Sequence, residues 1–516
     1  MTRNAFYVTT AIAYPNGEPH IGHAYEMIAT DAIARWKRLE GRDVYFLTGT
    51  DEHGIKMVQT AQAQGLPVRE LADRNAARFK ELAGVLNISN DDFIRTTEPR
   101  HRAAVQDIWR RMLANGDIYQ STYKGWYSVR DEAYFDASEL TDGEGGKKFA
   151  PSGAEATWVE EPSYFFRLSA YQERLLAYYD AHPEFIAPRE RRNEIVSFVS
   201  GGLQDLSVSR TTFDWGIPVP DAPGHVMYVW VDALTNYITG VGYPDVESEK
   251  FKRYWPADLH VIGKDIIRFH TVYWPAFLMS AGIEVQHRVF AHGFLTVDGK
   301  KMGKSVGNVI DPFVLTEEFG VDPVRFFFLR EVSFGNDGDY SRDKIVNRAN
   351  ADLANDFGNL AQRSLTMINK NCEGRVPVPG LLNKDDEALL ASADAAIAAA
   401  VAAMDVQLLH EAVGAIWEVV GEANRYFAAQ EPWALKKTDF KRMETVLYVT
   451  AEIIRRLAIP ALAFVPESAG RMLDFLGVAR EQRRLSFADD SGKLTPGTLL
   501  PTPEPVFKRF ERIKPE

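Results

Sequence analysis

Cysteine is nearly absent from this sequence, since Cys372 is the only one among 516 residues. A single cysteine excludes an intramolecular disulfide and every zinc site that needs several cysteines. No uninterrupted apolar run approaches the roughly 18 residues typical of a membrane helix, so we expect no membrane partner. The first residues lead straight into a strand-like segment, so we also expect no signal peptide. The cytoplasm is therefore the expected compartment.

The sequence also contains fewer basic residues than acidic ones. Lysine and arginine number 59 against 71 aspartate and glutamate, for a net charge of −12. This deficit lowers the expectation of nucleic-acid binding. It does not exclude such binding, because a protein that holds a folded RNA needs only local basic patches. The proportions of 46% hydrophobic and 25% charged residues are those of a globular chain with several domains.

The N-terminal part alternates strand-like and helix-like segments. Residues 6–10 and 44–50 have the pattern of buried strands, and residues 21–39 have a helical pattern between them. Another helix is expected to begin near Pro99 and to end at Gly116. Strand–helix alternation predicts an α/β fold with a doubly wound parallel sheet, whose ligands bind at the carboxyl ends of the strands.

In the rest of the chain the sequence pattern changes at two places, near residues 118 and 349. After residue 118 the pattern becomes irregular, and residues 138–161 resemble an exposed loop, so we expect an insertion that splits the sheet domain. From residue 349 onward, Ala-rich and Leu-rich stretches such as 385–404 and 443–457 predict a helical bundle. The expected segments are a sheet domain in two halves, 1–117 and 224–293, an insertion, 118–223, a linking region, 294–348, a helical domain, 349–480, and a tail that packs back on the body, 481–516.

The first motif with chemical meaning is His20-Ile-Gly-His23, directly after the first strand and its loop. Histidines three apart at a helix start lie on one face, where backbone N–H groups and the helix dipole favour phosphate. Gly22 between them leaves space for a flat base to approach the backbone. An isolated tetrapeptide of this kind is more often a pair of solvated loop histidines. The strand–loop–helix context favours phosphate binding.

The second motif is Lys300-Lys-Met-Gly-Lys304-Ser305, after another strand-like segment at 290–297. Lysines on a glycine-containing loop can approach a polyphosphate and neutralise charge that develops in a transition state. Taken alone, such a segment is more often a surface turn. Its occurrence together with the histidine motif, in this order, favours a function.

These two motifs resemble the HIGH and KMSKS signatures of class I aminoacyl-tRNA synthetases, and the resemblance covers nearly the whole chain. It implies a Rossmann-type catalytic domain, split by a connective insertion and followed by an α-helical anticodon-binding domain. Gly303 stands where the family pattern usually has serine. Because both flanking lysines and the final serine remain, we expect a more flexible loop that still functions.

Further segments are similar to those of methionyl-tRNA synthetases, namely residues 11–17, 49–54, 228–233 and 262–270. The resemblance implies that Asp51 holds the α-ammonium group of the amino acid. The methionine pocket that it implies consists of Ile12, Ala13, Tyr14, Trp230, Ala233, Leu234, Tyr237, Ile266 and His270. A thioether offers little to hydrogen-bond, so selection rests on shape and on sulfur–aromatic contacts of roughly 0.3–1.5 kcal/mol each. For any one of these aromatics alone, ordinary core packing is the commoner explanation, whereas the matching set favours a pocket.

For ATP, the resemblance assigns His20 and His23 to the phosphates, with Gly22 beneath the adenine. Gly263 and Asp265 match the nucleoside-binding turn, where a carboxylate can accept from ribose hydroxyls. The remaining implied ATP-binding residues are Arg210, His292, Lys304 and Ser305. The catalytic residues that the resemblance implies are His20, His23, Lys301 and Lys304.

The lack of cysteine in the insertion indicates which subtype of the family the chain resembles. Many methionyl enzymes carry a cysteine-ligated zinc knuckle in the insertion, and the cysteine-specific relative also uses zinc. Residues 126–158 contain no cysteine, so the chain resembles the zinc-free subtype, with ATP and Mg²⁺ as cofactors. The insertion also looks too short for the editing domain of the isoleucine, valine and leucine enzymes.

The helical region also contains candidate functional residues. Asn359 and Arg363 are one helical turn apart, and Pro432-Trp433 interrupts a helix and can present an indole. All four match residues with which the family reads the anticodon. An aromatic platform with hydrogen-bond donors is what unstacked bases require. The alternative for Trp433 is a buried anchor at a helix end.

The resemblance implies a ligase that joins L-methionine to tRNA(Met), initiator and elongator, through methionyl-adenylate. Two other functions stay open. One is a nucleotidylyltransferase that acts on a small metabolite, which has no evident use for the helical domain. The other is a catalytically silent relative kept for RNA binding, which only Gly303 favours. Since some relatives have an additional dimerising domain that is not seen here, we expect a monomer.

Overall fold

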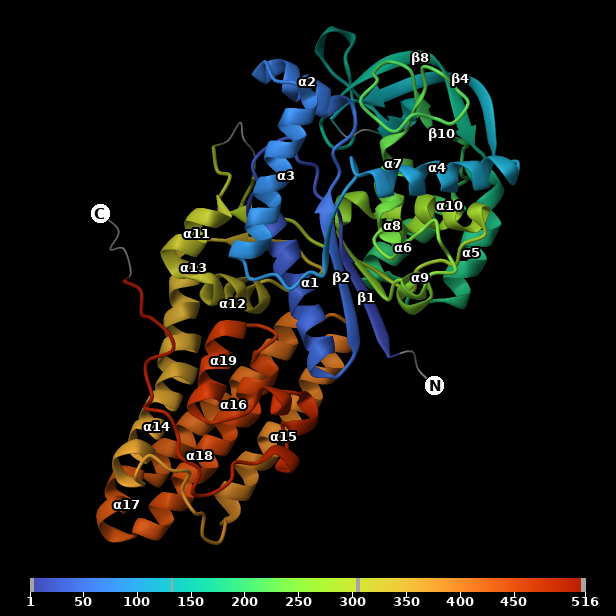
Figure 1. The fold of residues 1–516 in the computed structure, drawn as a ribbon. Coiled ribbons are helices and arrows are strands. Elements are labelled where there is room, and N and C mark those ends of the chain that lie inside the picture. The colour runs from blue at the N-terminus through green and yellow to red at the C-terminus, as the bar shows by residue number, and fades with distance from the viewer. Residues whose placement is uncertain (1–3, 131–132, 303–306, 512–516) are drawn as a thin grey trace.

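The computed structural model describes residues 4–130, 133–302 and 307–511. An α/β body contains the N-terminal part of the chain, and an elongated helical bundle extends from it (Figure 1). The C-terminal tail runs back along the bundle toward the body (Figure 1). Near its end, Phe510 and Asn350 exchange two hydrogen bonds, each 2.8 Å long.

The body is built on a six-stranded sheet in which every described pairing is parallel. In spatial order its strands are β3 (Asp92–Arg95), β2 (Asp43–Thr50), β1 (Ala5–Thr10), β13 (Leu259–Gly263), β14 (Val289–His292) and β9 (Ile186–Ala187). The chain proceeds from β1 to β2 on one side and later returns to β13 on the other. Doubly wound sheets bind ligands at such a switch point. The predicted α/β fold class is confirmed.

Helices cover both faces of this sheet, because successive residues of a strand point to opposite sides. Phe6 and Val8 of β1 join one hydrophobic core, and Tyr7 between them joins another. The helices that pack in the first core include α1 (Ile21–Leu39), α3 (Val68–Val85) and α12 (Val321–Glu331), and those in the second include α4 (Pro99–Ala114), α7 (Val229–Leu234), α8 (Asn236–Thr239) and α10 (Trp274–Ala281). α1 has the predicted bounds, and α4 begins at the predicted proline.

The region predicted to be irregular contains a second, antiparallel sheet. Its strands are β4 (Ile118–Ser128), β5 (Ala133–Phe135), β6 (Thr141–Asp142), β7 (Lys148–Phe149), β8 (Glu155–Phe166) and β10 (Leu206–Ser207). The prediction of an exposed loop over 138–161 was therefore wrong in part, because β6, β7 and the beginning of β8 lie there. Trp126 of β4 is paired with Trp158 of β8, with ring centroids 5.6 Å apart. Such cross-strand contacts stabilise a strand only once its partner is present.

The same region also completes the main sheet. β9 is the edge strand beside β14, and α6 (Arg189–Ser200) packs on β9 and on α5 (Gln172–Ala181). The segment expected as an insertion, 118–223, is thus not a separate unit. A strand of two residues is too short to leave a pattern in the sequence.

A small sheet connects the body with the bundle. It consists of β15 (Leu295–Val297), β16 (Lys300–Lys301) and β17 (Gly338–Tyr340), and α11 (Pro312–Phe319), α12 and α13 (Arg342–Arg348) belong to the same region. The bundle contains α14 (Asn359–Asn371), α15 (Lys384–Asp405), α16 (Leu409–Gln430), α17 (Pro432–Thr438), α18 (Phe440–Ala461) and α19 (Pro466–Phe475). The helices predicted over 385–404 and 443–457 are confirmed within α15 and α18.

Among the described residues, α15 alone is long and apolar enough to cross a membrane by length and composition. In the structure it packs against α16 and α18. It also carries Asp394, whose carboxylate lies 2.6 Å from a guanidinium nitrogen of Arg456. These contacts are typical of a helix in a bundle.

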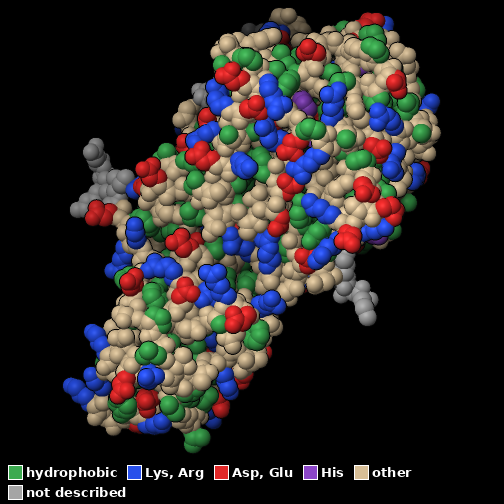
Figure 2. All heavy atoms as spheres, in the orientation of Figure 1, with side chains coloured by type: hydrophobic (Ala, Val, Ile, Leu, Met, Phe, Trp, Pro, Cys, Tyr) green, Lys and Arg blue, Asp and Glu red, His purple; other side chains and the backbone are tan. Residues whose placement is uncertain are grey.

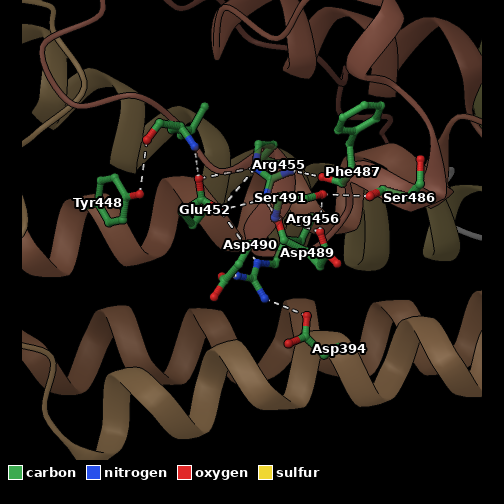
Figure 3. A network of polar contacts seen from close by, with 11 residues as sticks. Asp394, Tyr448, Glu452, Arg455, Arg456, Ser486, Phe487, Asp489, Asp490 and Ser491 are labelled. Carbon is green, nitrogen blue, oxygen red and sulfur yellow. Dashed lines mark hydrogen bonds and ion pairs between the residues drawn. The ribbon is translucent and has the colours of Figure 1, made fainter.

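A buried polar network fastens the tail to the bundle (Figure 3). Arg455 and Arg456 of α18 are almost fully buried, and both approach the carboxylate of Glu452. Arg455 also donates to the main-chain oxygen of Asp489 at 2.7 Å, and Glu452 accepts from the main-chain N–H of Leu494. The tail thus supplies hydrogen bonds that these buried charges need.

One buried arginine contacts both the body and the bundle. Arg325 of α12 is fully buried, and its guanidinium lies 2.7 Å from the carboxylate of Asp31 on α1. It also donates to the main-chain oxygens of Ala463 and Phe464 after α18, each at 3.2 Å, and of Leu86 after α3 at 3.3 Å. One side chain therefore fixes three segments that are distant in the sequence.

Candidate active site

A cavity of about 870 Å³ opens at the switch point of the main sheet. Its walls come from the end of β1, the loop after β2, the start of α1, α7, α8, and the ends of β13 and β14. These segments follow the carboxyl ends of parallel strands, where the fold class predicts a ligand.

The two motif histidines form the cap of α1 at this cavity. His20 Nδ1 accepts the N–H of Gly22, and His23 Nδ1 accepts the N–H of His20, each at 3.1 Å. The rings stack with centroids 3.9 Å apart. Because each Nδ1 accepts, the neutral form of each ring carries its proton on Nε2. Burial, and then the neighbouring His20, hold the pKa of His23 well below its ordinary value. The pair can therefore donate N–H groups at a helix N-terminus, an arrangement that binds phosphate.

Gly22 is required by the histidine pair itself. A Cβ at this position would lie 2.8 Å from Cε1 of His20. It would also lie 3.9 Å from Cε of Met302, which lines the cavity. The described part of the lysine motif thus reaches the histidine motif. The contact of Gly22 with adenine stays a prediction.

The cavity is lined by all ten residues predicted to bind methionine. They are Ile12, Ala13, Tyr14, Asp51, Trp230, Ala233, Leu234, Tyr237, Ile266 and His270. Phe269, which was not predicted, stacks on Trp230 with ring centroids 3.8 Å apart and an interplanar angle of 7°. It lies inside the segment 262–270 that already resembled the family, so that segment was the available signal.

Two polar side chains of this pocket, His270 and Tyr237, are neutral and bonded to each other. His270 donates its Nδ1 proton to the carbonyl of Ile266 at 2.9 Å, and its Nε2 accepts from the Tyr237 hydroxyl at 2.7 Å. Burial lowers the pKa of His270 to about 4 and raises the pKa of Tyr237. An uncharged wall without competing charges suits a thioether.

Asp51 supplies the carboxylate of the pocket and is 7% exposed. Its N–H donates to the carbonyl of Ala13 at 2.8 Å, and the N–H of Ala13 donates to Gly49 at 2.9 Å. These bonds join the segments that follow β1 and β2. A carboxylate is thereby held beside an apolar surface, as an amino-acid ligand requires.

The predicted nucleotide residues divide into two groups. Gly263, Asp265 and His292 line the cavity. Arg210 does not: it is buried in contact with Glu161 at 4.0 Å, and its guanidinium lies 4.6 Å from the centroid of the Tyr228 ring. These contacts hold Arg210 between the antiparallel sheet and α7.

Sequence reasoning missed Glu26, which also lines the cavity. Glu26 accepts from the main-chain N–H of Ala11 at 2.9 Å, and its other oxygen lies 2.8 Å from Nε2 of His292. Burial alone would lower the pKa of His292, but the hydrogen bond and charge of Glu26 outweigh it, so the pKa is raised. The available signal was helical spacing, because Glu26 follows His23 by three positions on α1.

The lysine motif is only partly within the described residues. Lys301 belongs to β16, whose main chain pairs with β15. Gly303, Lys304 and Ser305 lie outside the described residues. Lys56 is one of several basic residues at the cavity that were not predicted, and its Nζ lies 4.9 Å from the centroid of the Tyr14 ring.

Two of the four predicted anticodon-binding residues, Arg363 and Trp433, contact each other in the bundle. The Arg363 guanidinium lies 5.5 Å from the Trp433 ring and 5.1 Å from the Phe427 ring. Trp433 is 45% exposed, which disfavours its interpretation as a buried anchor. Pro432 is the first residue of α17, and Asn359 begins α14 one turn before Arg363. The face in Figure 2 shows acidic and basic side chains interspersed over body and bundle.

Within residues 4–130, 133–302 and 307–511, no group of three or more His, Cys, Asp or Glu side chains is arranged so that it could hold a metal ion.

Comparison with known proteins identifies the family. Residues 6–144 and 147–365 match the model described as tRNA synthetases class I (M), and residues 376–514 match the anticodon binding domain of methionyl tRNA ligase. The chain belongs to the methionine–tRNA ligase family. The predicted family and the predicted enzyme class, an aminoacyl-tRNA ligase, are confirmed.

Individual methionine–tRNA ligases are similar over their full length. Those of Brucella suis biovar 1 and Rhizobium meliloti are 63% and 60% identical over 511 residues, which cover 99% of each chain. The structure of Mycobacterium tuberculosis methionyl-tRNA synthetase in complex with methionyl-adenylate is 58% identical with a TM-score of 0.96, over 98% of this chain and 100% of that one. The apo form of that enzyme is 55% identical with a TM-score of 0.89, over 99% of each chain.

Proposed function

We propose that this protein activates L-methionine with ATP and transfers it to tRNA(Met), initiator and elongator. One observation supports this most. A single cavity combines a pair of donating histidines at a helix N-terminus with a neutral pocket that has a carboxylate at its edge. Relatives named methionine–tRNA ligase, and a homologue solved with methionyl-adenylate, are consistent with these substrates.

The amino acid binds by both of its ends. Asp51 accepts the α-ammonium group, and the thioether lies among the aromatic and aliphatic side chains around Trp230 and Tyr237. Selection depends on shape, because the neutral His270 offers no charge to attract a polar competitor. This arrangement leaves the carboxylate of methionine directed toward the nucleotide.

In the first step, a carboxylate oxygen of methionine attacks the α-phosphorus of ATP while the bond to the β-phosphate oxygen breaks. Methionyl-adenylate and pyrophosphate result. The carboxylate is already ionised, so the protein needs neither a nucleophile nor a general base. Its contribution is positioning and stabilisation of charge.

That charge develops on the phosphates. His20 and His23 donate to the phosphate oxygens, while Lys301 and Lys304 approach from the lysine loop. Gly263 and Asp265 hold the nucleoside, and Mg²⁺ arrives bound to the triphosphate, whose oxygens are its preferred ligands. Glu26 orients His292 at the same end of the cavity.

In the second step, the terminal ribose hydroxyl of the tRNA attacks the acyl carbon, and AMP leaves with the electrons of the cleaved anhydride bond. Selection of the tRNA occurs at the other end of the molecule. There Asn359, Arg363 and Trp433, with Pro432 at the start of α17, provide hydrogen-bond donors and an aromatic platform for the anticodon.

ATP–pyrophosphate exchange with each of the twenty amino acids tests the proposal. Methionine is expected to support exchange well above all others. Exchange supported mainly by another amino acid would overturn the substrate assignment. A complete lack of exchange would favour the silent relative.

Three further properties belong to the same proposal. The protein works without zinc, as a monomer, in the cytoplasm. Metal analysis of the purified protein, light scattering after size exclusion, and fractionation of cells test them in turn. Stoichiometric zinc, a dimeric mass or a membrane-bound fraction would contradict the respective property.

A further inference from the structure

A buried cluster of two histidines and an aspartate lies just outside the cavity lining. Asp232 and His101 are fully buried, and His53 is 8% exposed. Nδ1 of His53 lies 2.6 Å from one carboxylate oxygen of Asp232, and Nε2 of His101 lies 2.8 Å from the other. No role has been assigned to these three residues so far.

The proton positions follow from the partners. Nε2 of His101 lies 3.1 Å from the main-chain oxygen of Asp232 as well as close to its carboxylate. Both partners are acceptors, so His101 carries a proton on Nε2. Burial alone would raise the pKa of Asp232, but the charge and hydrogen bonds of His53 and His101 outweigh it and lower the pKa. The ionised carboxylate therefore accepts one hydrogen bond on each oxygen.

The cluster connects the two parts of the methionine pocket. Asp232 lies on α7 between Trp230 and Ala233, which line the pocket. His53 follows Asp51 by two residues in the segment after β2, and His101 belongs to α4. The carboxylate thus joins the thioether side of the pocket to the ammonium side and to a helix of the core.

The indole of Trp230 is held in place by ring contacts. Its Nε1 is buried without a hydrogen-bond partner within the described part of the chain. Its ring contacts are the stack on Phe269 and a looser edge contact with His270, whose centroid is 6.1 Å away. A stack resists tilting but permits sliding, so the lateral position of Trp230 depends on α7, which Asp232 anchors.

We propose that Asp232, held between His53 and His101, is a positioning residue that sets the spacing between Trp230 and Asp51 and thereby the affinity for methionine. This inference rests on the proposed role of the cavity. ATP contacts other walls, so the effect falls on methionine alone.

The test compares steady-state ATP–pyrophosphate exchange in the variants Asp232→Asn, His101→Phe and His101→Gln. An asparagine has one accepting oxygen in place of two, so one histidine loses its acceptor. Phenylalanine keeps a ring but removes the donor. Both variants are expected to raise KM for methionine about tenfold, the scale of one lost hydrogen bond to a charged group, with KM for ATP within about twofold. Glutamine can still donate to the carboxylate, so His101→Gln recovers most of the affinity.

The control is Asp31→Asn, a second fully buried carboxylate that pairs with Arg325 and does not line the cavity. It is expected to lower Tm without changing KM for methionine. Equal increases in both KM values, or a change in methionine KM in the Asp31 variant, would overturn the positioning role. So would a His101→Gln variant as impaired as His101→Phe. If wild-type protein showed no methionine-dependent exchange, the proposed function would fail instead.

Discussion

Each motif histidine uses its Nδ1 to cap α1, and Nε2 of the same ring is the proposed phosphate donor. The Nδ1 atoms of His20 and His23 accept main-chain N–H groups of the first turn, so the rings cannot rotate without uncapping α1. This fixes where the Nε2 protons are before ATP arrives. Preorganised donors of this kind stabilise a transition state without reorganisation during the reaction.

Lys304 is the side chain expected to respond to charge on the leaving pyrophosphate. Lys304→Ala is predicted to slow adenylate formation by about 10²–10³-fold, the scale for the loss of one well-placed donor. Single-turnover formation of methionyl-adenylate measures this. Lys300→Ala removes the same charge from the same sequence motif at an exposed position and serves as the control. Equal rates in the two variants would show that Lys304 has no special role.

His270 gives the stability a specific dependence on pH. Its pKa is about 4 in the folded protein against an ordinary 6.5. Between these values the unfolded chain binds a proton that the folded protein does not, so the free energy of unfolding falls as pH decreases from 6.5 toward 4. Above 6.5 the contribution is constant. In His270→Gln this part of the pH dependence disappears, as urea unfolding at several pH values can show. Parallel pH profiles for both proteins would contradict the assignment.

At the scale of helices and strands, α14 and α17 together present the anticodon candidates. Trp433→Ala is predicted to raise KM for tRNA about tenfold or more, because stacking of one base is worth about 1–3 kcal/mol. ATP–pyrophosphate exchange should be unchanged. Phe440→Ala removes a similarly exposed ring, 46% against 45%, from the adjacent helix and is the control. A parallel loss of charging and exchange in Trp433→Ala would indicate a structural role.

The sequence predicts an element well where its stabilising contacts repeat along the element. α1 shows this, because fourteen of its nineteen residues are buried, spread along the whole helix, and its bounds agree with the prediction. β8 shows the opposite. Its central Trp158 is 57% exposed, and its strand partner Trp126 is remote in the sequence. The information that makes this segment a strand lies outside the segment.

The residues of the candidate site also differ in how well the sequence predicts them. Residues in segments that resemble the family, such as Trp230 and Asp51, line the cavity as a group. Arg210 was selected by an isolated match, and its environment depends on Glu161 in a separate sheet. Glu26 was overlooked because its helical spacing from His23 is a weaker signal than a match to a segment that resembles the family.

At the scale of the whole molecule, stability depends on the contact between body and bundle at Arg325. The fully buried Asp31 pairs with Arg325 at 2.7 Å and with Arg35 at 2.6 Å, so Arg325→Met removes one of its two cations and is predicted to lower the free energy of unfolding by about 3 kcal/mol. The double variant Arg325→Met/Asp31→Leu should recover part of that loss, since neither member of the buried Arg325–Asp31 pair remains. Urea unfolding of the three proteins tests this. A double variant no more stable than the single one would show that the hydrogen bonds of Arg325 to the bundle dominate.

The geometry of α1 has a mechanical consequence. Asp31, which holds the interdomain arginine, lies eleven residues after His20 on one continuous helix, or about 16 Å at 1.5 Å per residue. A rotation of α1 by about 4° around that point would therefore displace the imidazole of His20 by about 1 Å. Such a shift is enough to make or break a phosphate hydrogen bond. α1 therefore connects the histidine cap at the cavity to the contact between the body and the helical bundle.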